Sequence, residues 1–477
     1  MVSLIVRRRE NICSIVSELF QGRAELHPQP LVEDSLSRHI GIATASAVVI
    51  GSMVGSGIFT TSGFIARDVG SPARLIGLWA AGGLIALVGA LCYGELGAAI
   101  PEAGGEYVYL REAYGTFVAY LSGWTSLFAG FSGAIAAAAL AFVGYLHHFF
   151  PVLDAGQLAG KGVALAVLWL LTAAHVTSVG PGGALQQILA VVTVAGMAAV
   201  IAVGLASGHG STSNFSSVAP AQGSAVVALI FVLYTYSGWN AAAYLAGEIR
   251  KPSRTLPAAL IAGTVVVTAL YLGMNAMYLY AMPVGAMSGV LAVADKAAVV
   301  LLGPMAGHFT AGLIALTLLG STSAMVLSGP RVYYAMARDG VFFRSVARVH
   351  PTLGTPARAM ILQAAWASFL IVFFGVFERL VLYTGFAVTV FTALAVASVI
   401  VLRVRRAGLA RPFRVPAYPW LPAAYVAVSA LIAGYTIINR PTEAILGILT
   451  VGAGAPFYFV GRFWEGPRTA QAAGLRP

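Results

Sequence analysis

The sequence predicts an all-α polytopic membrane protein with about twelve transmembrane helices. Of the 477 residues, 59% are hydrophobic and only 9% are charged, and the mean hydropathy is +0.85. No class of soluble globular protein has this composition. Apolar stretches of about 20 residues also recur along the chain, each long enough to cross a hydrocarbon layer of roughly 30 Å as a helix. Strands of a membrane barrel are about ten residues long and alternate in polarity, so the pattern favours helices.

The apolar stretches define the expected spans. In chain order they are residues 40–65, 72–97, 115–148, 161–179, 184–206, 224–247, 257–282, 308–337, 358–376, 379–402, 420–438 and 443–462. Nothing in the sequence indicates a separate soluble domain. Residues 1–38 form an expected cytoplasmic N-terminal segment and residues 463–477 a cytoplasmic tail.

The basic residues predict the orientation in the membrane. The net charge is +11, and most of the 28 Lys and Arg residues fall in the termini and loops that share one side if the N-terminus is inside. This bias follows the positive-inside rule and places both termini in the cytoplasm. The charge therefore reflects membrane topology, and no nucleic-acid partner is expected.

The sequence offers no cofactor or metal motif. The cysteines, Cys13 and Cys92, do not support a disulfide framework, and the eight histidines match no metal-ligand spacing. His147 and His148 are adjacent, so on a helix their side chains diverge by about 100°. No GxxxxGK[ST] phosphate loop occurs, so ATP-driven pumping is not predicted. An enzyme enclosed in the membrane is an alternative of a different class.

The first span contains residues that disfavour a continuous helix. It reads VVIGSMVGSGIFTTSGF at 48–64. Gly51 and Gly55 form a GxxxG, which by itself indicates close helix packing. The GSG at 55–57 lies in mid-span, where each glycine costs about 1 kcal/mol relative to alanine. A helix broken there would expose backbone N–H groups at the start of a half-helix, which suits an anion.

The sixth span carries a second interruption. Ser237 and Gly238 follow Tyr234 within an otherwise apolar run, with Trp239 next in the chain. A packed aromatic patch is the structural alternative. Interruptions at matching places in two halves are typical of inverted-repeat transporters, which bind substrate at the bilayer midplane. The pattern favours two five-helix repeats, 39–206 and 224–402, followed by two helices within 420–462.

Several long motifs resemble the amino acid–polyamine–organocation permeases, especially their L-type amino acid transporter branch. The resemblance covers residues 39 to 463 and implies a leucine-transporter-like fold with helices 1 and 6 broken. The motifs are VVIGSMVGSGIF (48–59), GALCYGELGAAIPEAGGEYVYLREAYG (89–115), YSGWNAAAYLAGEIRKPSRTLPAALI (236–261), SGPRVYYAMARDGVF (328–342) and RPFRVPAYPWLP (411–422).

The resemblance implies where a substrate binds. The N–H groups of Ser56, Gly57 and Ile58 would take a carboxylate. The carbonyls of Met53, Tyr234 and Ser237 would take an ammonium, with Tyr234 also in the place of a gating aromatic. The full set of expected substrate-binding residues is Met53, Val54, Gly55, Ser56, Gly57, Ile58, Tyr234, Ser237, Gly238 and Trp239.

The expected function is secondary active transport or exchange of neutral L-amino acids across the cell membrane by alternating access. Spans 1 and 6 carry no formal charge at their breaks, which favours a neutral substrate side chain because a midplane charge costs roughly 2.5–3.5 kcal/mol. Ser132, Gly133, Ser321 and Ser323 suggest a small or medium pocket. The alternatives are a polyamine or cationic amino acid permease, and a non-transporting amino acid sensor.

Coupling and partners are also predicted. Many relatives carry a helix-5 lysine, and aligning Gln186 with their glutamine places Thr193 at the lysine position. Thr193, with Ser321, Thr322 and Ser323, could ligate sodium, but no carboxylate lies nearby, so exchange or proton coupling is preferred.

Animal L-type transporters join a glycoprotein through a loop cysteine. The corresponding loop at 150–160 has no cysteine, so no disulfide-linked partner is expected. Membrane lipid is the remaining partner.

Two charged residues in the spans have structural interpretations. Glu95 lies near the cytoplasmic end of the second span, where a structural ion pair is preferred over a proton relay. Arg331 lies at the inner end of the eighth span and is expected to snorkel or to pair.

Overall fold

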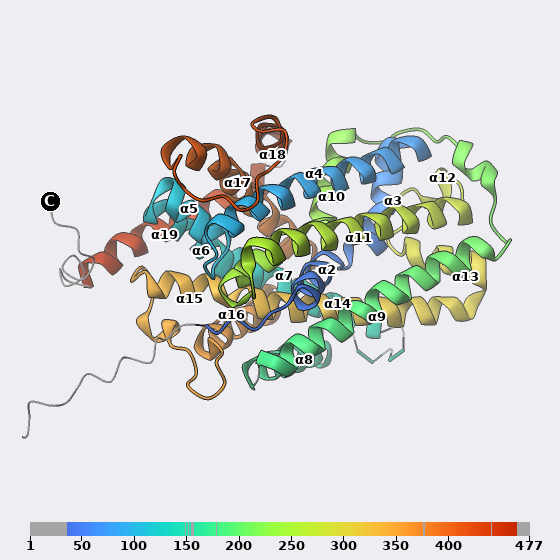
Figure 1. Cartoon of the computed structure of the whole chain (residues 1–477). Coiled ribbons are helices and arrows are strands. Elements are labelled where there is room, and N and C mark those ends of the chain that lie inside the picture. Colours follow the sequence, from blue (N-terminus) through green and yellow to red (C-terminus); the bar gives the residue numbers. More distant parts are fainter. Residues whose placement is uncertain are drawn as a thin grey trace, which may run out of the picture. The chain divides into compact units, whose positions relative to one another are not determined.

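The computed structural model describes residues 36–464 except 148, 151, 154–156, 178, 375–376 and 440. Every named element in this part of the chain is a helix (Figure 1). The predictions for Cys13, His148, most of segment 1–38 and most of tail 463–477 fall outside the described residues. The elements are α2 (Ile42–Met53), α3 (Gly57–Val69), α4 (Pro72–Ala99), α5 (Glu106–Tyr114), α6 (Thr116–Thr125), η1 (Ser126–Gly130), α7 (Phe131–Leu146), α8 (Leu158–Thr177), α9 (Val179–Ala206), η2 (Thr212–Ser216), α10 (Ala225–Thr235), η3 (Ala241–Glu248), α11 (Pro252–Ala281), α12 (Val284–Met287), α13 (Val293–Leu302), α14 (Pro304–Ser328), α15 (Pro330–Arg338), η4 (Arg344–Ala347), α16 (Ala357–Phe374), α17 (Phe377–Arg405), α18 (Trp420–Asn439) and α19 (Pro441–Trp464).

The predicted spans coincide with helices. Among the described residues, 8 spans are long and apolar enough to cross a membrane, and the bent pair α2–α3 raises this to 9. Three further predicted spans correspond to the shorter apolar helices α10, α16 and α19. The third and eighth spans are each composite: α6, η1 and α7 run on from one another, as do α14 and α15. The fold is therefore that of an all-α polytopic membrane protein.

Prolines and glycines set several helix boundaries. Pro72, Pro252 and Pro304 occupy the first turns of α4, α11 and α14, where proline's missing N–H and fixed φ cost nothing. α3 ends at Gly70, which adopts a left-handed conformation with φ 59°. Glycine takes this conformation without the steric penalty that a Cβ would bring.

Gly51 allows α2 to pack closely against α9 and α14. A Cβ at Gly51 would lie 2.1 Å from Gln186 Nε2 and 3.2 Å from the Gly320 carbonyl. The buried Gln186 amide on α9 donates to the Ala47 carbonyl at 3.2 Å and to the Gly320 carbonyl at 3.4 Å. The close-packing interpretation of the GxxxG is therefore confirmed for Gly51, whereas Gly55 falls in the interruption between α2 and α3.

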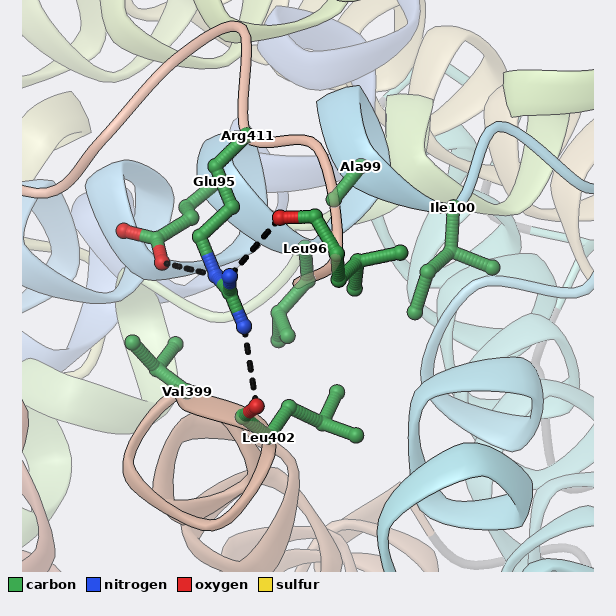
Figure 2. Close-up of a pocket in the computed structure, with 8 residues that line it drawn as sticks. Glu95, Leu96, Ala99, Ile100, Val399, Leu402 and Arg411 are labelled. Atoms are coloured by element: carbon green, nitrogen blue, oxygen red, sulfur yellow. Dashed lines mark hydrogen bonds and ion pairs between the residues drawn. The ribbon is translucent and has the colours of Figure 1, made fainter. Parts of the chain in front are cut away.

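Glu95 on α4 forms the predicted structural ion pair. Its carboxylate accepts hydrogen bonds from Arg403 at 2.9 and 2.6 Å and from the Val415 N–H at 2.7 Å. Arg411 Nε lies 3.6 Å from the same carboxylate and donates to the Leu402 carbonyl beside a small cavity (Figure 2). Glu95 therefore fastens the segment after α17 onto α4.

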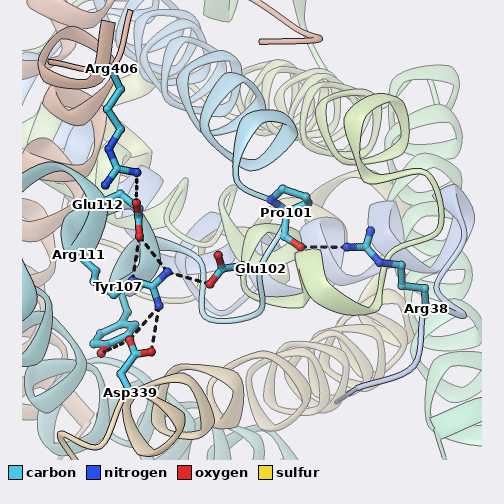
Figure 3. Close-up of polar contacts among 8 residues, drawn as sticks. All are labelled: Arg38, Pro101, Glu102, Tyr107, Arg111, Glu112, Asp339 and Arg406. Atoms are coloured by element: carbon cyan, nitrogen blue, oxygen red, sulfur yellow. Dashed lines mark hydrogen bonds and ion pairs between the residues drawn. The ribbon is translucent and has the colours of Figure 1, made fainter. Parts of the chain in front are cut away.

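A second charged network joins α5 to the end of α15 (Figure 3). Arg111 donates to Asp339 at 2.9 Å and to Glu102 at 2.8 Å, and it also contacts Glu112. Glu112 in turn pairs with Arg406, just after α17. These contacts tie together segments on the side that the charge bias assigns to the cytoplasm.

Candidate substrate-binding site between two helix breaks

The first span is interrupted where the sequence predicts. α2 ends at Met53, Val54 is extended (φ −81°, ψ 96°), and α3 begins at Gly57 after a bend of 43°. The N-cap side chain of Ser56 makes no capping hydrogen bond. The first four N–H groups of a helix lack intrahelical acceptors and carry the positive end of its dipole. The break therefore presents the positive end of a helix dipole in mid-span.

The sixth span is interrupted as well. α10 ends at Thr235, and the Ser237 N–H then donates to the Tyr234 carbonyl at 3.0 Å. Gly238 has φ 96°, and a Cβ there would lie 2.5 Å from the Ser52 carbonyl. Glycine is required at this position for its backbone conformation and for its contact with α2. The chain continues as the 3-10 helix η3.

The two breaks lie directly against each other. A Cβ at Gly57 would approach Thr235 Oγ1 to 2.6 Å, and Thr61 Oγ1 lies 3.1 Å from the same hydroxyl. The first turn of α3 therefore touches the last residue of α10. Unpaired N–H groups at one helix end adjoin carbonyl groups at another, which is the charge pattern that a zwitterion requires.

Two of the three expected ammonium acceptors already receive internal hydrogen bonds. The Met53 carbonyl accepts from the Tyr271 hydroxyl at 2.7 Å, and the Tyr234 carbonyl accepts from Ser237. A carbonyl oxygen has two lone pairs, so each keeps one for a ligand. Ser237 is exposed and Tyr234 is half-buried.

Some predicted site residues serve packing. The side chains of Val54 and Ile58 are fully buried. Trp239 is 6% exposed and packs edge-on against Tyr93 at 4.9 Å. A Cβ at Gly89 would lie 2.5 Å from the indole. The Trp239 side chain is therefore directed at α4.

Three residues of α11 that the sequence analysis missed flank the breaks. Tyr271, Asn275 and Tyr278 are spaced i, i+4 and i+7, so they share one helix face. The Ser62 hydroxyl of α3 donates to Asn275 at 2.7 Å, and the Tyr278 hydroxyl donates to the Ile58 carbonyl at 3.3 Å. A polar stripe at helical spacing within an apolar span was the available signal.

The predicted coupling residues have different neighbours in the structure. A Cβ at Gly320 would lie 3.9 Å from Thr193 Oγ1, and one at Gly55 would lie 3.8 Å from Ser321 Oγ. Thr193 therefore lies beside the α14 turn that contains Gly320 and Ser321, and Ser321 faces the first break. The other two hydroxyls have different partners: Thr322 donates to the Leu318 carbonyl, and Ser323 bonds His175 Nε2 at 2.8 Å.

A cavity of about 170 Å³ lies beside the first turn of α2 and the adjoining part of α9. Its polar lining comes from His39, Thr44 and Gln187, with Glu248 at the end of η3. Across the described ranges, no group of three or more His, Cys, Asp or Glu side chains could hold a metal.

Comparisons with known proteins identify a family and several similar sequences. Residues 40–449 match the family model described as amino acid permease. The serine/threonine exchanger SteT of Bacillus subtilis is 30% identical over 432 residues, covering 90% of this chain and 97% of the relative. The human b(0,+)-type amino acid transporter 1 is 31% identical over 433 residues, covering 89% and 88%.

A third relative extends the range of named substrates. The mouse large neutral amino acids transporter small subunit 2 is 28% identical over 442 residues, covering 90% of this chain and 82% of its own. The family match spans most of the chain and includes both helix breaks. The chain is a multi-pass membrane protein that belongs to the amino acid permease family.

Proposed function

We propose that the protein is a carrier that exchanges neutral L-amino acids across the cell membrane by alternating access, and not an enzyme. The observation that carries this proposal is the contact between the start of α3 and the end of α10 through Gly57 and Thr235. It sets the N–H groups at the start of α3 beside the carbonyl groups at the end of α10. An α-amino acid carries one charge of each sign about one residue apart, so it fits both helix ends at once.

The two charged groups of the substrate have separate partners in this proposal. The N–H groups of Ser56, Gly57 and Ile58 hold the carboxylate. The carbonyl of Met53, with those of Tyr234 and Ser237, holds the ammonium. The substrate lies between the α2–α3 break, the α10–η3 break, the α6–α7 span and α14.

A neutral side chain is favoured by the charge inventory. Residues 41–66 and 225–247 contain no Asp, Glu, Lys or Arg. A cationic side chain or a polyamine would need a counter-charge at the midplane, where burial of a formal charge is expensive. The names of the relatives, which include a serine/threonine exchanger and a large neutral amino acid transporter, support the same substrate class.

The remaining features follow from this assignment. Both termini lie in the cytoplasm, and two five-helix repeats (39–206 and 224–402) precede the last two helices. The loop at 150–160 contains no cysteine, so transport needs no disulfide-linked partner. A companion band that disappears on reduction of native membranes would contradict that last point.

Exchange in liposomes tests the proposal. Purified protein is reconstituted into vesicles loaded with unlabelled neutral amino acid, and uptake of a panel of radiolabelled amino acids is measured, with empty vesicles as the control. We expect uptake of at least one neutral amino acid that depends on the internal load. Saturable binding without flux would identify a sensor, and preferred uptake of arginine or spermidine would identify the cationic alternative.

A further inference from the structure

One buried hydroxyl lies between the carbonyl ends of both half-helices. Tyr271, in the second half of α11, is fully buried. Its hydroxyl is 2.7 Å from the carbonyl of Met53, the last residue of α2. The same hydroxyl is 3.2 Å from the carbonyl of Thr235, the last residue of α10.

These two carbonyls need a donor in the absence of substrate. The last four carbonyls of a helix have no intrahelical N–H, and an unpaired polar group in an apolar interior is destabilising. A phenol has one proton, so the shorter contact with Met53 takes the main hydrogen bond and Thr235 shares it. Each carbonyl retains a lone pair that can point toward a ligand.

The surroundings of the ring fix the hydroxyl in place. The Tyr271 ring packs edge-on against Trp79 at 5.4 Å and in a tilted arrangement against Tyr236 at 5.0 Å. The Tyr236 hydroxyl donates to the Trp79 carbonyl at 3.0 Å. One turn further along α11, Asn275 donates to the Tyr271 carbonyl at 2.8 Å and accepts from Ser62 of α3. The ring is therefore held by α4 and by the residue that follows α10, and its own helix α11 is tied to α3.

We propose that Tyr271 is a positioning residue for the substrate amino group. Its hydroxyl orients the Met53 and Thr235 carbonyls so that their free lone pairs face the ammonium, and it sets the separation of the two breaks. The inference rests on the proposed function, and it adds the Thr235 carbonyl and a residue of α11 to the site. Tyr271 acts through these carbonyls and does not itself contact the substrate.

The test is Tyr271→Phe in reconstituted vesicles, because phenylalanine keeps the ring contacts and removes only the hydroxyl. We expect KM for the preferred amino acid to rise about three- to tenfold, the range that one lost hydrogen bond produces, with a smaller change in kcat. The matched control is Tyr333→Phe, which removes another fully buried hydroxyl bonded to a backbone carbonyl, that of Ser126 at 3.2 Å. The KM of this control variant should stay within twofold of the wild-type KM.

A competition measurement separates positioning from a purely structural role. In wild type, the amino acid should inhibit uptake far better than its α-hydroxy acid analogue, which lacks the ammonium. Tyr271→Phe should weaken inhibition by the amino acid and leave inhibition by the hydroxy acid unchanged. The preference for the amino acid over the hydroxy acid should therefore be smaller in the variant than in wild type. Equal weakening of both, or an unchanged KM with lower thermal stability, would overturn the inference. Absence of exchange in wild type would instead overturn the proposed function.

Discussion

Arg331 and Glu248 form a two-point ion pair inside the protein. Nε lies 2.7 Å from Oε1 and Nη2 lies 2.9 Å from Oε2, and both side chains are only 1% exposed. The pair joins the first turn of α15 to the last residue of η3. Of the two outcomes predicted for Arg331, pairing is confirmed.

Removing one partner of this pair should strongly destabilise the fold. Arg331→Met leaves the Glu248 carboxylate buried without its cation, which costs about 3–5 kcal/mol. Thermal unfolding in detergent should show a clear fall in the transition midpoint. The double variant Arg331→Met with Glu248→Gln should recover much of the loss, because no charge is then buried. Equal midpoints for the single and double variants would contradict this account.

Gly55→Ala should impair transport without disturbing the fold. The added methyl would lie 3.8 Å from Ser321 Oγ, an ordinary van der Waals contact, yet it would enter the space between the first break and α14. Substrate uptake should fall at least tenfold while the unfolding midpoint stays near that of wild type. Gly77→Ala is the control, since a Cβ there has no neighbour within 4 Å. Undiminished uptake by Gly55→Ala would mean that the break does not contact substrate.

The buried Glu106 should make stability depend on pH. It lies on α5, between two predicted spans, and accepts from Tyr93 at 2.9 Å and Ser122 at 3.0 Å. Burial raises the pKa of the Glu106 carboxyl from 4.5, and these hydrogen bonds oppose the rise. Because the folded-state pKa is the higher one, the contribution to stability is fully present below pH 4.5 and is lost as pH rises through the raised pKa.

Glu106→Gln checks this assignment. The neutral amide cannot ionise. The unfolding midpoint of the variant should therefore decline less than that of wild type as the pH rises above the ordinary carboxyl pKa. Thermal scans of both proteins across a pH series measure the difference. Parallel curves for the two proteins would show that Glu106 does not ionise with the proposed shift.

Uptake should be indifferent to sodium. Thr193 flanks the α14 turn at Gly320, but Thr322 and Ser323 direct their hydroxyls to Leu318 and His175. All of these hydroxyls are neutral, and none of the coupling candidates is a carboxylate that would strengthen a sodium site. Uptake with sodium or choline outside should agree within about twofold in wild type and in Thr193→Lys, whose ammonium would supply the charge that related carriers have. Steep sodium dependence that Thr193→Lys abolishes would instead establish a sodium site.

The spans and both breaks could be predicted because their signals are local. Apolar length defines a span, and Gly57 and Gly238 lie where a helix is least favoured and close approach is needed. The partners of polar groups could not be predicted, because they depend on packing between distant segments. Gln186 fills the space above Gly51, and Tyr271 reaches Met53 across 218 positions of sequence.

The central claim is that the facing breaks bind both charges of one amino acid. Competition by single-charge analogues tests it most directly: inhibition of labelled amino acid uptake is measured with the amino acid, its methyl ester and its α-hydroxy acid. The contact between α3 and α10 at Gly57 and Thr235 predicts that loss of either charge weakens inhibition at least tenfold. Inhibition by the methyl ester or the hydroxy acid that equals inhibition by the parent amino acid would contradict the claim.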